Sequence, residues 1–186
     1  DCAAVTSGPG RMGLYFLSVG AGLRSSEIVY DRAGSSFAAT GAEDYDWDAL
    51  LAGAGLLHLS GITPALGPRS AEAALAAARA AKRLGVPVSF DGNYRPMLWE
   101  AWDSDPRTIL SELIGLTDIL FGNHRDLSLV LGQEFSGEGA DRRREAAEAG
   151  FAAFPDLKLI ASTARHTVTA DHHRIAARVD LGGGGH

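Results

Sequence analysis

The sequence predicts an α/β protein whose mostly parallel sheet is covered by helices, with a small β segment near its N-terminus. From residue 46 onward, apolar runs of about five residues alternate with amphipathic or Ala-rich stretches of about ten or more. This is the pattern of consecutive βαβ units and predicts a parallel sheet covered by helices on both faces. Before residue 46, two strand-like runs flank a Gly-containing turn and predict a β hairpin. These patterns divide the chain into a β segment (residues 1–40), an α/β segment (41–181) and a Gly-rich tail (182–186).

The β segment contains two predicted strands, residues 12–19 and residues 27–32. Both are rich in aromatic and aliphatic side chains, which favour extended backbone. Glycines at positions 20 and 22 fall between them, and an Ala-Gly-Ser-Ser sequence at residues 33–36 ends the second strand. A two-stranded sheet, distinct from the main sheet, is therefore expected.

The α/β segment opens with a short helix over residues 46–52, which precedes the first buried strand. An Ala-rich helix follows that strand; we expect Ser70 to cap it and Gly85 to end it. Apolar runs predict strands at residues 56–61, 86–90, 118–121 and 157–162. Helical patterns predict helices at residues 97–102, 106–116, 123–131 and 140–154. A hairpin of residues 166–170 and 174–179 is expected to close the fold.

The composition excludes several classes of protein. The chain has 186 residues, of which 46% are hydrophobic and 22% charged, so it can bury one sizeable core. No apolar run approaches the roughly 20 residues of a membrane helix, and a formal net charge of -6 lacks the basic face that binds nucleic acid. The N-terminus shows no signal-peptide pattern, and the single cysteine, Cys2, is expected to be inert. We therefore expect a cytoplasmic protein.

Polar residues follow the predicted strands at the ends where parallel sheets bind ligands. In such sheets the ligand lies outside the carboxyl ends of the strands. The candidate site residues at these ends are Ser60, Asp91, Asn93, Asn123 and Thr163.

Four short motifs occur in a specific order along the chain. They read Gly-Leu-Tyr-Phe-Leu at residues 13–17, Val-Tyr-Asp-Arg-Ala-Gly-Ser at 29–35, Asp-Gly-Asn-Tyr-Arg-Pro-Met-Leu-Trp at 91–99, and Asp-Ile-Leu-Phe-Gly-Asn at 118–123. Each motif is weak by itself, but the ordered set resembles the pfkB (ribokinase-like) family of carbohydrate kinases, and more narrowly its 2-keto-3-deoxygluconate kinase branch. The resemblance implies a ribokinase-like fold in which the first two motifs form a β lid over the sugar.

The resemblance implies four substrate contacts, namely Tyr15, Tyr30, Arg32 and Arg95. A keto-deoxy sugar acid presents a carboxylate, for which Arg offers a charge-assisted, potentially bidentate partner. Tyrosine adds a flat apolar face and a hydroxyl. The alternative is structural, because Tyr and Arg alternating on a strand are also typical of a solvated face with cross-strand pairs.

The resemblance further implies ATP and Mg²⁺ as cofactors. It assigns phosphate placement to Asn93, Asn123 and Asp126, where the family usually shows N-x-x-E, so the carboxylate here is one methylene shorter. It places Thr163 and Arg165 near the nucleotide. Structural alternatives stay open: Asp91 and Asn93 as turn residues, and Asn123 as a helix N-cap with Asp126 in the first turn.

No direct metal site is expected from the histidines. His166 begins the predicted closing hairpin, and His172 and His173 are adjacent at its turn. Adjacent histidines at a hairpin tip, without a suitably spaced further ligand, are more typical of a polar turn. The resemblance implies that Mg²⁺ bridges the phosphates of ATP and is placed through water.

The catalytic base of the family is expected in a G-x-G-D segment, whose Asp removes the proton of the sugar hydroxyl. The 186 residues contain no such segment, so no catalytic residue is assigned. Residues 182–186 read Gly-Gly-Gly-Gly-His, typical of a linker or non-native tail without fixed structure, or a remnant of that segment. Alone, the chain is expected to be nearly inactive, either as a fragment or as part of a longer protein.

The function expected from these residues is transfer of the ATP γ-phosphoryl group to a keto-deoxy sugar acid such as 2-keto-3-deoxygluconate. Because lid strands of this family often pair between subunits, a homodimer through residues 12–19 is also expected. The alternatives are another sugar or nucleoside kinase of this fold, for example a fructokinase, and a noncatalytic sugar-binding fragment. A nucleotide-binding oxidoreductase is disfavoured, since no G-x-G-x-x-G follows a first strand.

Overall fold

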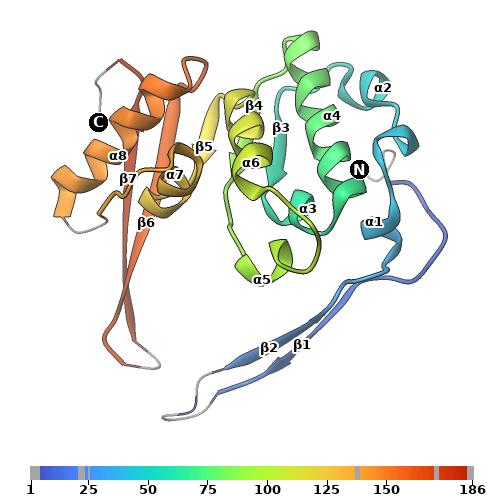
Figure 1. The fold of residues 1–186 in the computed structure, drawn as a ribbon, viewed down its shortest axis with the longest axis horizontal. Coiled ribbons are helices and arrows are strands. Elements are labelled where there is room, and N and C mark those ends of the chain that lie inside the picture. The colour runs from blue at the N-terminus through green and yellow to red at the C-terminus, as the bar shows by residue number, and fades with distance from the viewer. Residues whose placement is uncertain (1–4, 21–23, 25, 137–138, 170–171, 184–186) are drawn as a thin grey trace.

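A computed structural model describes residues 5–20, 24, 26–136, 139–169 and 172–183. Cys2 and the end of the Gly-rich tail, residues 184–186, lie outside these ranges. The predicted β hairpin is confirmed: β1 (Leu14–Ser18) pairs antiparallel with β2 (Glu27–Asp31). All ten residues of this ribbon are exposed, and the ribbon projects away from the body of the molecule (Figure 1).

Three short helical segments connect the ribbon to the main sheet. Ser35 caps the first, since its hydroxyl accepts a hydrogen bond from the Ala38 N–H at 3.3 Å, and Asp46 caps the third through the Ala49 N–H at 3.1 Å. The segments are α1 (Ser36–Ala39), η1 (Ala42–Asp44) and α2 (Trp47–Leu51).

The main sheet has five strands in the order β3-β4-β5-β6-β7. The first four are parallel and β7 is antiparallel to β6, which confirms the predicted mostly parallel sheet. The strands are β3 (Leu57–Ser60), β4 (Val88–Asp91), β5 (Ile119–Phe121), β6 (Leu159–Thr167) and β7 (His173–Leu181).

The larger helices pack on one face of this sheet (Figure 1). Their apolar side chains form a core with Phe90, Leu120 and Ile160, all of which are buried. The larger helices are α4 (Pro68–Leu84), α6 (Pro106–Gly115), α7 (His124–Leu131) and α8 (Gly139–Ala153). Two short helices, α3 (Ile62–Ala65) and α5 (Pro96–Trp99), precede α4 and α6 in the chain. None of the described helices is both long and apolar enough to cross a bilayer.

The prediction that helices cover both faces is wrong for the described residues. Phe121 and Val179, which neighbour buried positions on their strands, remain exposed on the other face. The strand order explains this, because right-handed crossovers that always advance in the same direction place every connecting helix on the same side.

Two local predictions are corrected by the structure. Ser70 does not cap the Ala-rich helix: α4 begins earlier, at Pro68 after Gly67, whose φ of 148° favours glycine. Ser70 is buried instead, and its hydroxyl donates to the Ala38 carbonyl at 3.4 Å. The strands expected at residues 157–162 and 166–170 are one continuous strand, β6, which pairs with β7 over nine residue pairs from Leu159 to Thr167.

Candidate functional site

The carboxyl ends of the parallel strands are aligned in a single row. In register, Ser60 lies opposite Asp91, Asp91 opposite Phe121, and Phe121 opposite Ala161. A glycine follows each of the first three strands, and its N–H donates to the carbonyl of the neighbouring strand, at 2.7 Å for Gly61, 2.9 Å for Gly92 and 3.0 Å for Gly122. These bonds fix the loops that carry the candidate site residues.

A cavity of about 880 Å³ lies at these strand ends; we call it the strand-end cavity. It brings together six residues that the sequence singled out, from the ends of β4 and β5, from α7 and from β6. They are Asp91, Asn93, Arg95, Asn123, Asp126 and Thr163.

Arg95 reaches the strand-end cavity from the loop after β4. It directly precedes Pro96, the first residue of α5, and has the extended backbone typical of a residue before proline (φ -130°, ψ 93°). The residue is exposed, so its guanidinium is available to an anionic ligand. Such a group can bind a carboxylate through two parallel hydrogen bonds.

Asn93 has an unusual backbone conformation, with φ at 38°. Few residues other than glycine adopt this left-handed region, and asparagine is among the more tolerant. Its amide nitrogen lies 3.5 Å from the Ser60 hydroxyl oxygen, a weak contact at the limit of a hydrogen bond. The turn interpretation therefore accounts for little of the hydrogen-bonding capacity of this side chain.

Asn123 and Asp126 form a capping box at the start of α7, which confirms the helix-cap interpretation. The Asn123 side chain accepts a hydrogen bond from the Arg125 N–H, and the Asp126 carboxylate accepts one from the Asn123 N–H, both at 2.8 Å. Burial raises the pKa of Asp126, and the nearby charge of Asp91 raises it further. Two neighbouring carboxylates at this position favour a cation or its hydration shell.

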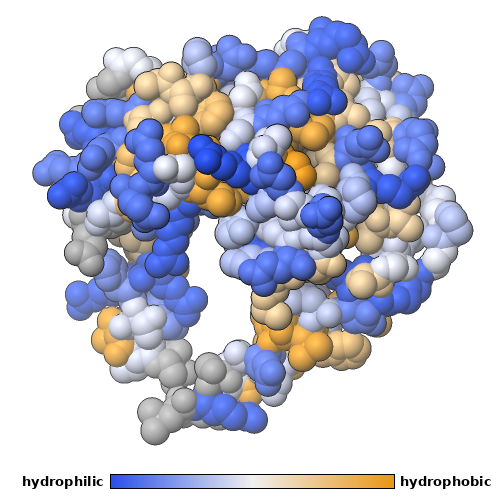
Figure 2. All heavy atoms as spheres, in the orientation of Figure 1, coloured by the Kyte–Doolittle hydropathy of each residue, from blue (hydrophilic) through white to orange (hydrophobic). Residues whose placement is uncertain are grey.

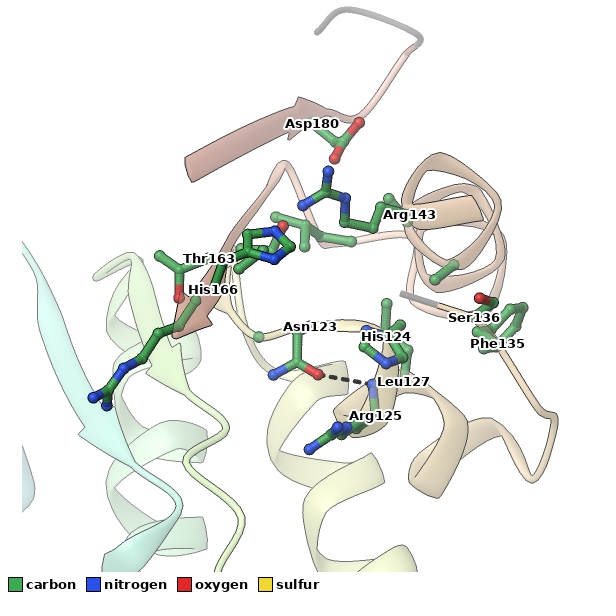
Figure 3. A pocket seen from close by; sticks show the side chains of 17 residues that line it. Asn123, His124, Arg125, Leu127, Phe135, Ser136, Arg143, Thr163, His166 and Asp180 are labelled. Carbon is green, nitrogen blue, oxygen red and sulfur yellow. Dashed lines mark hydrogen bonds between the residues drawn. The ribbon is translucent and has the colours of Figure 1, made fainter. Parts of the chain in front are cut away.

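A second cavity, of about 620 Å³, lies between α7, α8 and β6 (Figure 3); we call it the α7–α8 cavity. Arginines 125, 143 and 165 line it, together with two histidines. Burial lowers the pKa of His124, as do the charges of Arg125 and Arg143. The cavity is thus electropositive and suits an anion such as a phosphate chain.

The two cavities meet at a common wall. Asn123 and Thr163 line both, so a ligand in either cavity reaches these side chains. The residues shared by the two cavities are Gly122, Asn123, Arg125, Ser162 and Thr163.

Sequence reasoning missed Arg143 as a cavity residue. Figure 3 shows its side chain reaching from α8 toward Asp180. Asp180 is itself paired with Arg178, at 2.5 Å. The only signal was the run of three arginines at residues 142–144, and such a run is equally typical of a solvated helix face. Because successive helical residues point about 100° apart, the run alone does not show which arginine faces a cavity.

Thr163 and Arg165 do not follow a strand end, contrary to the prediction, but lie within β6. Arg165 lines only the α7–α8 cavity of the two, and its guanidinium lies 2.8 Å from the His173 Nε2 atom. Among the residues that the structure describes, no three His, Cys, Asp or Glu side chains gather in a metal-binding group.

The predicted lid residues lie together on the ribbon, apart from the strand-end cavity. Tyr15 and Tyr30 are opposite each other, with ring centroids 6.5 Å apart. Arg32 continues the same face, and its Cζ atom lies 4.4 Å from the centre of the Tyr30 ring. None of the three lines the cavity that contains Arg95. In the space-filling view, an opening separates the β6–β7 hairpin from the region of α5 above the ribbon (Figure 2).

Comparisons with known proteins agree with this fold. A family model described as pfkB family carbohydrate kinase matches residues 3–162. The 2-dehydro-3-deoxygalactonokinase of Haloferax volcanii is 31% identical over 121 residues, 65% of this chain and 37% of that protein. The 2-dehydro-3-deoxygluconokinase of Escherichia coli K12 is 38% identical over 79 residues, 42% of this chain and 25% of that protein.

The solved structures include similar chains. A crystal structure of 2-dehydro-3-deoxygluconokinase from Thermotoga maritima superposes with a TM-score of 0.83 at 34% identity, covering 94% of this chain and 52% of that one. This similarity confirms the predicted fold. The chain spans about half the length of this structure and less than half that of the curated relatives it matches.

Proposed function

The chain belongs to the pfkB family of carbohydrate kinases, as its four motifs predicted, and we propose that it carries the acceptor and phosphate-positioning residues of a kinase for a keto-deoxy sugar acid such as 2-keto-3-deoxygluconate. The observation that supports this proposal is the strand-end cavity, where Arg95 faces the same space as Asn93, Asn123 and Asp126. The names of the relatives from Haloferax volcanii, Escherichia coli and Thermotoga maritima point to the same substrate class.

The carboxylate of the sugar acid would bind to Arg95. A neutral sugar offers no charge to this guanidinium, so the arginine favours acids over fructose or ribose. The ribbon would then act as the lid, bringing Tyr15, Tyr30 and Arg32 over the sugar and excluding water that would compete for the phosphoryl group.

The nucleotide would occupy the α7–α8 cavity, with its phosphates directed to the common wall. Asn123 and Thr163 would contact the transferring group, and Arg165 would offset its charge. In the transfer, the sugar hydroxyl oxygen bonds to the γ-phosphorus and the bond from phosphorus to the β,γ-bridging oxygen breaks. ADP leaves, and the hydroxyl proton passes to a general base, which the resemblance places in a G-x-G-D segment.

Mg²⁺ fits the donor set of the strand-end cavity beside this wall. The carboxylates of Asp91 and Asp126 supply hard oxygen atoms, which Mg²⁺ prefers, and it commonly keeps several waters and binds through one or two carboxylates together with substrate phosphates. The ion would neutralise the charge of the phosphates. Asp126 would hold it through water, because this carboxylate already accepts the Asn123 N–H.

The ribbon also supports a homodimer. Its two faces differ: Tyr15, Leu17 and Tyr30 share one, while Leu14, Phe16 and Val29 share the other. The second face carries Asp31 and Glu27 at its two ends, and its apolar centre is exposed, with Phe16 at 59% and Val29 at 56% of full accessibility. A second copy of the chain covering this face would leave the tyrosine face directed to the sugar.

The proposal is tested by measuring ADP release from Mg·ATP with 2-keto-3-deoxygluconate, 2-keto-3-deoxygalactonate and fructose as acceptors. We expect the purified protein to bind the sugar acids, and any turnover to favour them over fructose. Turnover that favours fructose would identify a neutral-sugar kinase. Sugar binding without turnover, even when a G-x-G-D segment is supplied, would identify a noncatalytic sugar-binding protein.

A further inference from the structure

Gly92 lies directly after β4 and is buried. Its N–H donates to the Phe121 carbonyl at 2.9 Å, and its φ lies outside the left-handed region. A Cβ atom at this position would lie 2.9 Å from the Oδ1 atom and 3.0 Å from the Cγ atom of Asp126. The need for glycine here therefore comes from the carboxylate of Asp126, not from the backbone conformation.

The Asp126 carboxylate is held on its other side by the helix cap. Its Oδ2 atom accepts the Asn123 N–H at 2.8 Å. Moving the carboxylate away from Gly92 would stretch this hydrogen bond, so the side chain cannot retreat without losing its capping contact.

The backbone of Gly92 cannot retreat either. A Cβ atom at Gly61 would lie only 2.0 Å from the Gly92 carbonyl oxygen, which shows how closely the end of β3 approaches the end of β4. Gly61 has an ordinary φ of -62°, so this close approach alone explains its glycine. Two glycines thus let the backbones at the ends of β3 and β4 approach closely and let the Asp126 side chain of α7 pack on the end of β4.

We propose that Gly92 is a positioning residue for the Asp126 carboxylate: the missing side chain at residue 92 leaves the space in which the shorter acid of the N-x-x-D sequence lies against the sheet. An aspartate reaches one methylene less far from α7 than a glutamate. At Gly92 the carboxylate packs on the strand-end backbone, beside Asp91 and the common wall.

For catalysis, this inference rests on the proposed function. If the carboxylate orients water around Mg²⁺ at the phosphates, then its position controls the nucleotide step and not the binding of the sugar. An alanine at residue 92 would displace the carboxylate, so the Mg²⁺ concentration needed for half-maximal rate would rise and kcat would fall by roughly 10-fold or more. KM for the sugar acid would stay within about 2-fold.

The positioning itself can be measured without any enzymatic activity. The backbone amide of Asn123 reports on the Asp126 carboxylate, because the two share a hydrogen bond. In ¹H–¹⁵N spectra, Gly92→Ala should shift the Asn123 amide signal strongly. The control Gly55→Ala should leave it in place, since a Cβ atom at Gly55 meets nothing within 4 Å. In an Asp126→Ala background, Gly92→Ala should cause little further shift.

A urea-unfolding cycle of the wild type, Gly92→Ala, Asp126→Ala and the double variant provides a second readout. Gly92→Ala should lower the unfolding midpoint when Asp126 is present and lower it much less in the Asp126→Ala background. If Gly92→Ala fails to fold while the double variant folds, the same conclusion is supported. Equal losses in both backgrounds, or an unmoved Asn123 amide signal in Gly92→Ala, would overturn the proposal. These two readouts stay valid if the kinase assignment fails. An intact coupling between Gly92 and Asp126, with no change in the Mg²⁺ concentration needed for half-maximal rate, would refute only the catalytic role.

Discussion

The guanidinium of Arg32 lies over the ring of Tyr30, with its Cζ atom 4.4 Å from the ring centre. Tyr15 faces Tyr30 across the ribbon, so a cation and two aromatic rings share one exposed face. A cation over a tyrosine ring is stabilised by about 0.5–1 kcal/mol at such a site. The ribbon therefore presents an ordered cation before any ligand binds.

Replacing Arg32 should weaken binding of a sugar acid while leaving the fold intact. We expect Arg32→Ala to reduce the affinity for 2-keto-3-deoxygluconate by roughly 5- to 10-fold, and Tyr30→Leu by roughly 2- to 5-fold, as the loss of cation–π support implies. Calorimetric titration measures both. Arg24→Ala is the control, since the Arg24 guanidinium donates to the Val19 carbonyl at the far end of the ribbon, and an equal loss of affinity in this variant would contradict the assignment.

Asp118 should stabilise the protein in a pH-dependent way. Its side chain is buried and accepts hydrogen bonds from the Val88 N–H at 2.9 Å and from the Lys158 ammonium at 2.8 Å. Burial would raise the pKa of Asp118, but the hydrogen bonds from Lys158 and Val88 outweigh it and the pKa is lowered. A lowered pKa means that the ionised group stabilises the fold at neutral pH and that this contribution is lost as the pH falls below about 4.

Asp118→Asn should accordingly lower the free energy of unfolding by about 1–3 kcal/mol at pH 7, and the difference from the wild type should shrink in acid. Urea unfolding at pH 7 and pH 3 measures this. Asp156→Asn, which removes an exposed ion pair with Lys82, should cost less than about 1 kcal/mol. A pH-independent effect of Asp118→Asn would refute the account.

Gly61→Ala should destabilise the fold, because the added Cβ atom meets the backbone of Gly92 at 2.0 Å. We expect a loss of about 1–3 kcal/mol in the free energy of unfolding. Gly55→Ala, in open space with an ordinary φ, should be neutral or stabilising by up to about 1 kcal/mol. Thermal or urea denaturation compares the two, and similar results for both variants would show that the strand ends are less tightly packed than described.

Phe16→Asp should dissociate the proposed dimer without disturbing the tyrosine face of the ribbon. Light scattering after size exclusion should show a smaller molar mass for this variant at micromolar concentration. Val168→Asp, which alters a similarly exposed apolar residue directly after β6, should leave the molar mass unchanged. A wild-type protein that is monomeric at all concentrations would exclude the dimer.

The elements of the fold followed from local patterns, whereas the cavities did not. The alternation of apolar runs and helices predicted the parallel sheet, and the Asn123–Asp126 spacing predicted the helix cap. Sequence could not show that β6 continues through Thr163, because Ser162–Arg165 is polar and continuity depends on pairing with β7.

Sequence also could not place Arg143 in a cavity, or show that Gly92 is glycine because of Asp126. These relationships join residues that lie on different elements and far apart in the chain. They depend on how the elements pack, which local patterns do not specify.

The most direct test of the account is a calorimetric titration of the wild type and Arg95→Ala with 2-keto-3-deoxygluconate and with fructose. The account predicts that the sugar acid binds more tightly than fructose, and that Arg95→Ala weakens the sugar acid by roughly 10- to 100-fold, as the loss of a charge-assisted hydrogen bond implies, while fructose is unaffected. Fructose binding as tightly as the sugar acid, or an equal loss for both sugars in Arg95→Ala, would contradict it.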